Sequence, residues 1–317
     1  MDGESFQVLA LDGGGYKGLF SAAVLAAIEQ DLGHPVLEHF DLVVGTSTGG
    51  ILALGLGRGL SPDQLVDFYS TWGPRIFVAT GVGTGWGWWL RRYRPDALRA
   101  GLAEVLGEAR LEDSVVPLVI PAFDLGRNQV HVFKTPHHPR LRRDGRERMV
   151  DVALATAAAP TYFPTHVVRG MRLIDGGVWA NNPVLVGIAE AVSLFGMPLD
   201  AVGVFSLGTT SDAVYHGEHL DHGGRLRWAS TAADLVVGAQ SVGASGIAEH
   251  LIGKDRYLRH DPAVPANVLR MDRVDTARLI AAAESTSRHI VPDFEAKFGH
   301  HIASRLPFTR VQSGVTT

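Results

Sequence analysis

Two patterns of hydrophobic and polar positions alternate along the first two thirds of the chain. Short apolar runs of strand length occur at Phe6–Leu11, 40–44, 115–122 and 201–207. Stretches with apolar residues at helical spacing occur between them, at 19–32, 51–60, Pro95–Leu106, 150–159 and 184–195. This alternation of strands and helices favours an α/β fold with a mainly parallel central sheet and helices on both faces.

Beyond residue 208 the pattern becomes largely helical. Helices are expected over 228–252 and Thr276–Phe298, with short edge strands near 257–259 and 267–271. No internal repeat or low-complexity linker divides the chain. We therefore expect a single domain over residues 1–317, with the candidate chemistry within 6–208 and a helical part over 209–317.

The most informative stretch is FDLVVGTSTGG, residues 40–50. A buried strand runs into Gly45, two threonines around Ser47, and Gly49, and an apolar helix follows. Gly-x-Ser-x-Gly between a strand and a helix is the nucleophile-elbow pattern, in which a sharp turn exposes the serine oxygen. Glycines at both flanks keep side chains away from the crowded turn. A plain small-residue turn is the competing interpretation, so the rest of the chain must decide.

A glycine-rich turn, Gly13 to Gly18 (GGGYKG), follows the first strand and opens a helix. Its glycines fit G-x-G-x-x-G, but the second strand does not end in the acidic residue that a dinucleotide site needs. The spacing to Lys17 is wrong for a P-loop. A third interpretation leads: the N–H groups of Gly13, Gly14 and Gly15 form an oxyanion hole for an intermediate at Ser47.

A carboxylate on a second glycine turn completes the set of candidate residues. A short strand over 172–174 ends at Asp175, and Gly176 and Gly177 follow. Such a carboxylate can approach another loop without steric obstruction, although an Asx-type turn is the plainer interpretation.

Composition narrows the function classes. The chain has no cysteine, which excludes disulfides and thiolate chemistry and fits a reducing, cytoplasmic compartment. A net charge of −4 gives no general reason to bind a nucleic-acid polymer. The N-terminus lacks a signal-peptide pattern, and no uninterrupted apolar stretch reaches transmembrane length. Membrane contact is therefore expected to be peripheral.

Two other features suggest binding but have plainer explanations. The segment 81–94 (GVGTGWGWWLRRYR) combines tryptophan and arginine, which suits a lipid headgroup boundary or a loop folded over the core. His137 and His138 lie in a polar stretch where histidines are usually solvated, and the spacing of His216, His219 and His222 fits a glycine-rich loop better than a metal site. We expect no metal and no cofactor.

Three stretches together resemble the patatin-like phospholipase family: DGGGYKG at 12–18, GTSTG at 45–49 and DGG at 175–177. ATAAAPTYF at 155–163 adds to this resemblance, which covers about residues 6–208. It implies a three-layer fold and a hydrolase with a Ser–Asp dyad. Ser47 matches the nucleophile, Asp175 the partner carboxylate, and Gly13, Gly14 and Gly15 the oxyanion loop. Lys17 falls at a position that supports that loop, with Gly18, Gly45, Gly49, Gly176 and Gly177 in supporting roles.

The sequence around the first two motifs is similar, more narrowly, to bacterial patatin-like effectors of anti-phage defence. That resemblance implies a phospholipase activated by a cyclic dinucleotide at a membrane surface, and it leaves the oligomeric state and the activator's binding residues open.

The expected chemistry is acyl-ester hydrolysis with Asp175 as base, which requires a raised pKa because an ordinary aspartate is a weak base. A Ser-His-Asp esterase is an alternative, with His131 and His166 the best-placed histidines. A nucleotide-binding or storage protein on the same scaffold, and a hydride-transfer enzyme, are the others.

Overall fold

The structure is a computed structural model. It describes residues 5–77, 93, 95–212, 221, 224, 228, 231–264, 269–270 and 273–304. The Trp/Arg segment 81–94, apart from Tyr93, and the three histidines His216, His219 and His222 lie outside the described residues.

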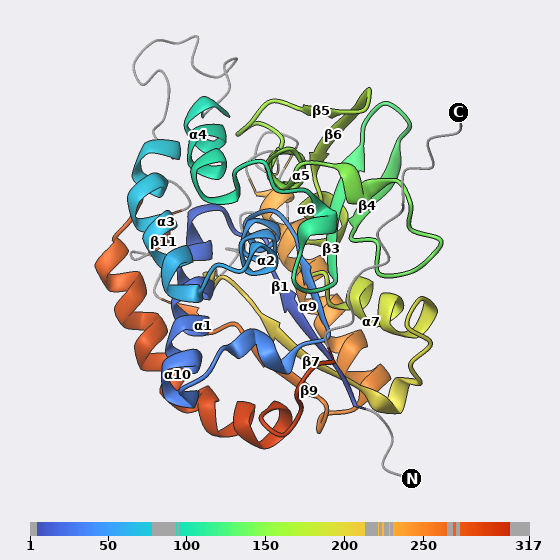
Figure 1. The fold of residues 1–317 in the computed structure, drawn as a ribbon. Helices are drawn as coiled ribbons and strands as arrows, with labels where there is room; N and C mark the ends of the chain where they lie inside the picture. The colour runs from blue at the N-terminus through green and yellow to red at the C-terminus, as the bar shows by residue number, and fades with distance from the viewer. Residues whose placement is uncertain are drawn as a thin grey trace.

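The centre of the molecule is an eight-stranded mixed sheet (Figure 1). Its parallel part has the order β3-β2-β1-β7-β9, which confirms the predicted mainly parallel centre. Strand β4 pairs antiparallel with one edge of β3, while β6 pairs antiparallel with the other edge, beyond the end of β2, and β5 pairs antiparallel with β6. The strand bounds are β1 Phe6–Leu11, β2 Leu42–Gly45, β3 Leu118–Asp124, β4 Gln129–Lys134, β5 His166–Val168, β6 Met171–Asp175, β7 Val202–Leu207 and β9 Tyr257–His260.

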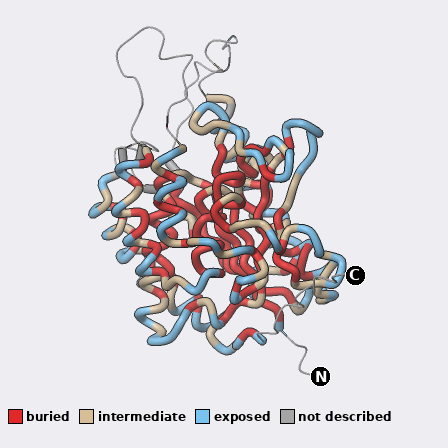
Figure 2. The backbone as a smooth tube through the Cα atoms, turned by 45° about the horizontal axis from the view of Figure 1, so that its top comes forward, coloured by how far each residue is buried: buried red, intermediate tan, exposed pale blue. Residues whose placement is uncertain are grey.

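Helices cover both faces of this sheet. Alternate residues of β1 point to opposite faces, so Leu9 and Leu11 join one buried cluster while Val8 and Ala10 join another. One face is covered by α1 (Gly18–Leu32), α2 (Thr48–Arg58), α3 (Pro62–Ile76), α4 (Pro95–Leu106), α5 (Met149–Thr156) and α10 (Thr276–Phe298). The other is covered by α7 (Val184–Ser193) and α9 (Ala232–Ile252). Figure 2 shows the buried chain running through the middle of the molecule.

The C-terminal part contributes to the same sheet and core. Strand β9 pairs with β7 in the main sheet, and α10 packs along α1 (Figure 1). Phe294 and Phe298 of α10 are buried against Phe40 and against Phe205 of β7. Residues near both ends of the chain therefore share one aromatic cluster.

Most predicted elements are present, and the structure differs from the prediction at several points. Strand β3 begins later than expected and continues to Asp124, and β5 was not expected. The prediction that His137 is solvated was wrong, because its side chain is only 2% exposed. Its Nε2 bonds Glu190 Oε1 of α7 (3.0 Å), and its ring stacks on Phe195.

Candidate active site

Ser47 lies on a strained turn between β2 and α2. Its φ of 55° and ψ of −120° are values that non-glycine residues rarely adopt. The positions two residues before and two residues after Ser47 must be glycine, because neighbouring backbone atoms approach them closely. A Cβ on Gly45 would lie 2.2 Å from the carbonyl oxygen of Gly49, and one on Gly49 would lie 2.2 Å from that of Leu11. This geometry is that of a nucleophile elbow.

Both the backbone and the hydroxyl of Ser47 are held by hydrogen bonds. The Ser47 amide donates to Thr156 Oγ1 (3.0 Å), and Thr156 donates to the carbonyl oxygen of Pro121 (2.6 Å). Ser47 Oγ donates to Asp175 Oδ2 at 2.6 Å. Ser47 is partly exposed, whereas Asp175 is buried. The hydroxyl is therefore both reachable and paired with a carboxylate.

Asp175 reaches Ser47 because β3 extends past the end of its neighbour. Strand β2 ends at Gly45, while β3 continues to Asp124, and β6 returns antiparallel along this extension. The return places Asp175 beside Ala122, close to the carboxyl edge of β2. A Cβ on Gly176 would lie 2.4 Å from the carbonyl oxygen of Pro121, so this turn also needs glycine.

The environment of Asp175 favours a proton acceptor active near neutral pH. Burial raises the pKa of Asp175 to about 6, and the hydrogen bonds from Ser47 and from the Gly177 amide (2.7 Å) oppose the rise. This direction agrees with the expectation from the sequence.

The glycine turn lies directly against Ser47. A Cβ on Gly13 would come within 3.2 Å of Ser47 Cβ. The Gly13 amide already donates to the carbonyl oxygen of Asn181 (3.0 Å). In the described part of the chain, the amides of Gly14 and Gly15 have no acceptor. They are the donors available to an oxyanion in this conformation.

The two ends of the glycine turn are fixed by different contacts. At its far end, Lys17 Nζ donates to the carbonyl oxygen of Thr210 (2.9 Å), and a Cβ on Gly18 would lie 2.1 Å from Thr48 Oγ1. At its near end, the carboxylate of Asp12 forms a buried ion pair with Arg259.

The two histidines of the triad alternative lie elsewhere. His166 is on β5, where its Nε2 bonds Asp151 Oδ1 at 3.1 Å. His131 is on β4 and packs edge-on against Phe133. Among the hydrogen bonds of the described histidines, none involves Ser47 or Asp175.

Three residues at the site were not singled out from the sequence. They are Thr156, which holds the Ser47 amide, Asn181, which holds the Gly13 amide, and Arg259, which pairs with Asp12. The ATAAAP stretch contains Thr156, and Asn181 closely follows the DGG turn, so both had a local signal. Arg259 had none, because it is 247 residues from its partner.

Helix α9 is bonded to the segment that follows Asp175. Asn181 Nδ2 donates to Ser241 Oγ (3.0 Å), and the Asn182 amide donates to Gln240 Oε1 (3.0 Å). The side chains of Val236, Val242 and Ile247 in α9 are exposed. The stretch Asp234–Ile252 of this helix is long and apolar enough to cross a membrane by length and composition alone, with a mean hydropathy of 1.2 and 22% of it buried.

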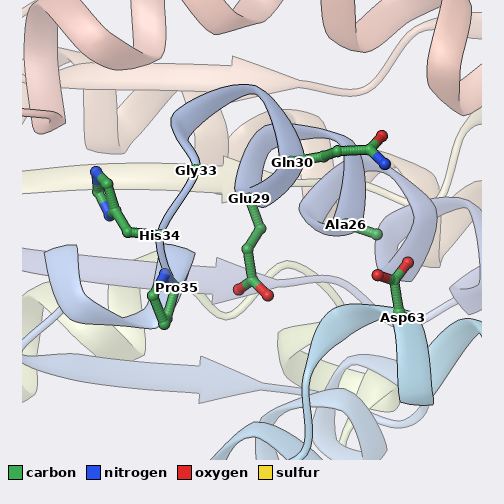
Figure 3. Close-up of a pocket in the computed structure, with 7 residues that line it drawn as sticks. All are labelled: Ala26, Glu29, Gln30, Gly33, His34, Pro35 and Asp63. Atoms are coloured by element: carbon green, nitrogen blue, oxygen red, sulfur yellow. The ribbon is translucent and has the colours of Figure 1, made fainter.

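Other candidate sites do not coincide with Ser47. A pocket of about 340 Å³ lies at the opposite end of α1 from the glycine turn (Figure 3). Its lining consists of Ala26, Glu29, Gln30, Gly33, His34, Pro35 and Asp63. In the described portion of the chain, no group of three or more metal-ligating side chains is found.

Comparison with known proteins shows the family of this chain. The family model described as patatin-like phospholipase matches residues 9–188. A protein of Pseudomonas aeruginosa named cGAMP-activated phospholipase is 38% identical over 283 residues, covering 85% of this chain and 83% of the relative. A protein of the same name from Vibrio cholerae is 39% identical over 202 residues, 58% of this chain and 57% of the relative.

The fold also has a solved counterpart. The crystal structure of VipD from Legionella pneumophila superimposes with a TM-score of 0.52 at 11% identity, over 91% of this chain and 67% of that one. The chain belongs to the patatin-like phospholipase family and is a lipid hydrolase.

Proposed function

We propose that this hydrolase cleaves fatty-acyl esters of membrane phospholipids through a dyad of Ser47 and Asp175. The observation that carries the proposal is the 2.6 Å hydrogen bond from Ser47 Oγ to Asp175 Oδ2, on a strained turn beside unpaired glycine amides. No third residue is needed to orient the base, because the Gly177 amide fixes the other carboxylate oxygen.

The first half of the reaction acylates Ser47. Its oxygen attacks the ester carbonyl carbon while its proton passes to Asp175, and the amides of Gly14 and Gly15 stabilise the oxyanion. One such donor lowers the barrier by about 3–4 kcal/mol. The intermediate then breaks its bond to the lysophospholipid oxygen, which leaves with the proton from Asp175.

The second half releases the fatty acid. Water attacks the acyl-Ser47 carbonyl and gives its proton to Asp175, the same amides stabilise the oxyanion, and the proton returns to Ser47 Oγ. In this mechanism Asp175 acts as base and acid in turn, which suits a pKa of about 6.

The proposed setting is a cytoplasmic protein that contacts the membrane peripherally. Its substrate lies in the bilayer, and α9 offers exposed aliphatic side chains next to the site. We also propose that residues 1–317 form one domain, because β9 and α10 complete the sheet and core that hold the glycine turn.

We also propose that a cyclic dinucleotide activates the enzyme in defence against phage. This activation is supported by relatives 38–39% identical that are named cGAMP-activated phospholipase.

The deciding experiment is fatty-acid release from mixed phospholipid vesicles, with and without a panel of cyclic dinucleotides. Ser47→Ala and Asp175→Ala serve as inactive variants. Release that requires one nucleotide and is absent in both variants supports the whole proposal, whereas equal release without nucleotide retains the hydrolase and rejects the activation. No release from folded protein contradicts the phospholipid substrate.

Two further variants separate the alternatives. His131→Ala and His166→Ala are expected to retain full activity, and a loss with either would favour a Ser-His-Asp esterase. A fluorophosphonate is expected to label wild type but not Ser47→Ala. A nucleotide-binding or storage protein has no activated serine and would not be labelled.

A further inference from the structure

Arg259 connects β9, the last strand of the main sheet, to Asp12, the residue directly before the glycine turn. Its guanidinium binds Asp12 through two bonds, Nη1 to Oδ1 at 2.9 Å and Nη2 to Oδ2 at 2.7 Å. Two parallel bonds of this kind fix the orientation of a carboxylate as well as its position. Arg259 lies outside residues 9–188, the stretch that the family model matches.

The other contacts of Arg259 hold its guanidinium in place. Nη1 also donates to Ser206 Oγ (2.8 Å), and Nη2 to Asp261 Oδ2 (2.8 Å). Asp261 packs against Gly208, where a Cβ would lie 2.2 Å from its Oδ1. The side chain of Arg259 is only 18% exposed. Its position is therefore set by β7, β9 and the turns that follow them.

Asp12 transmits this position to the glycine turn. It directly follows β1 and directly precedes Gly13, and its amide donates to the carbonyl oxygen of Leu207 (3.1 Å). Two residues later comes Gly14, the first of the two amides available to an oxyanion. Burial raises the pKa of Asp12 to about 6, and the guanidinium opposes that rise by favouring the carboxylate.

We propose that Arg259 is a positioning residue for lipid hydrolysis, which holds the Asp12 carboxylate so that the amides of Gly14 and Gly15 stay aligned beside Ser47. This inference rests on the oxyanion role given to the glycine turn above. Arg259 touches neither substrate nor Ser47, and acts through Asp12. Losing it should slow the chemical step and leave substrate binding unchanged.

The main test is Arg259→Lys, which keeps the charge but loses the two-pronged contact. Rates on a soluble p-nitrophenyl ester are measured under the nucleotide condition that gives the maximal wild-type rate, and are divided by the number of serines that a fluorophosphonate labels. We expect kcat per labelled site to fall at least about 10-fold, with KM within about twofold, since small misplacements of catalytic groups are costly. Arg256→Ala, at an exposed arginine directly before β9, is the matched control and should match wild type.

If the ion pair between Arg259 and Asp12 only stabilises the fold, Arg259→Lys gives a different result. It would lower the melting temperature and the number of labelled serines but leave kcat per labelled site at the wild-type value, which would overturn the proposal. If fluorophosphonate does not label wild type at Ser47, the proposed function fails, and the role of Arg259 with it.

Chemical rescue adds a measurement that a change in stability alone would not affect. Millimolar guanidinium should restore part of kcat in Arg259→Ala and none in Asp12→Asn/Arg259→Ala, because the cation needs the carboxylate to occupy the site. If the Arg259 variants do not fold, Ser206→Ala decides, because it removes one contact of the guanidinium and no charge. A several-fold loss of kcat in Ser206→Ala is expected, and a wild-type kcat would overturn the proposal.

Discussion

At the scale of single residues, the site depends on a buried carboxylate that has few partners. Asp175 accepts hydrogen bonds from Ser47 and the Gly177 amide and has no cationic neighbour among the causes of its raised pKa. Asp12, two residues before Gly14, has a comparable pKa but a guanidinium beside it. Burial thus raises the pKa of both aspartates, and different groups oppose the rise.

The first prediction concerns the pH dependence of hydrolysis. Asp175 must be ionised to accept the Ser47 proton, so kcat/KM should fall as pH decreases through about 6. Asp12 becomes protonated in the same range and weakens its bond to Arg259, so the fall should be steeper than for one proton. A pH–rate profile on a soluble ester measures this, and a rate that stays level down to pH 4.5 would contradict it.

The second prediction is that Asp175→Asn is inactive yet more stable than wild type. Below pH 3.8 the carboxyl group is neutral in both the folded and unfolded states. Between pH 3.8 and about 6 only the folded state keeps the proton, so the wild-type free energy of unfolding decreases as pH rises. The amide never ionises. Its advantage should therefore appear over this range and stay on the order of 2–3 kcal/mol above it.

Thermal or urea unfolding at several pH values between 4 and 8 provides the measurement. Ser47→Ala, equally inactive, is the control for loss of activity without loss of a charge. An Asp175→Asn variant that is less stable than wild type at pH 8 would show that the carboxylate is stabilising, against this prediction.

At the scale of secondary-structure elements, glycines in two helices have different effects on stability. Gly49 lies in the first turn of α2, against the backbone of Leu11, whereas Gly243 lies within α9, where no atom of the described residues is within 4 Å of a Cβ. The first glycine is required by space, while the second only weakens its helix.

The third prediction compares these two glycines directly. Gly49→Ala should lower the free energy of unfolding by more than about 2 kcal/mol, because its Cβ would lie 2.2 Å from the carbonyl oxygen of Leu11. Gly243→Ala should raise it by up to about 1 kcal/mol through helix propensity. Chemical denaturation of both variants tests this, and a loss of stability in Gly243→Ala would mean that a close contact forms there in solution.

Local sequence predicted the elements and the two glycine turns, because their signals lie within a few residues. It could not predict how Asp175 arrives at Ser47, since this depends on β3 being longer than β2 and on an antiparallel return. The burial of His137 and the pairing of Arg259 with Asp12 likewise depend on partners distant along the chain. Long-range pairings of this kind leave no periodic pattern.

At the scale of the whole molecule, the N- and C-terminal parts share one core. Phe294 of α10 is fully buried, with its ring 6.0 Å from that of Phe40 and 5.3 Å from that of Phe205. Because these aromatic contacts cross the proposed single domain, weakening one part should weaken the other.

The fourth prediction is that Phe294→Ala destabilises the entire protein by about 3–5 kcal/mol. Native-state hydrogen exchange should show a similar loss of protection in β1 and in α10. Glu284→Ala, an exposed change on the same helix, should alter neither. If only α10 lost protection, residues 209–317 would be a separate unit.

The position of β9 also has a consequence for the order of events during synthesis. A chain leaves the ribosome from its N-terminus, so Ser47 and Asp175 emerge well before Arg259. If the glycine turn is aligned only when Arg259 reaches Asp12, the nascent protein carries its nucleophile and base without a finished oxyanion hole. Lipid hydrolysis then begins only after β9, the last strand of the main sheet, is in place, so an incompletely synthesised enzyme does not attack the membranes of the producing cell.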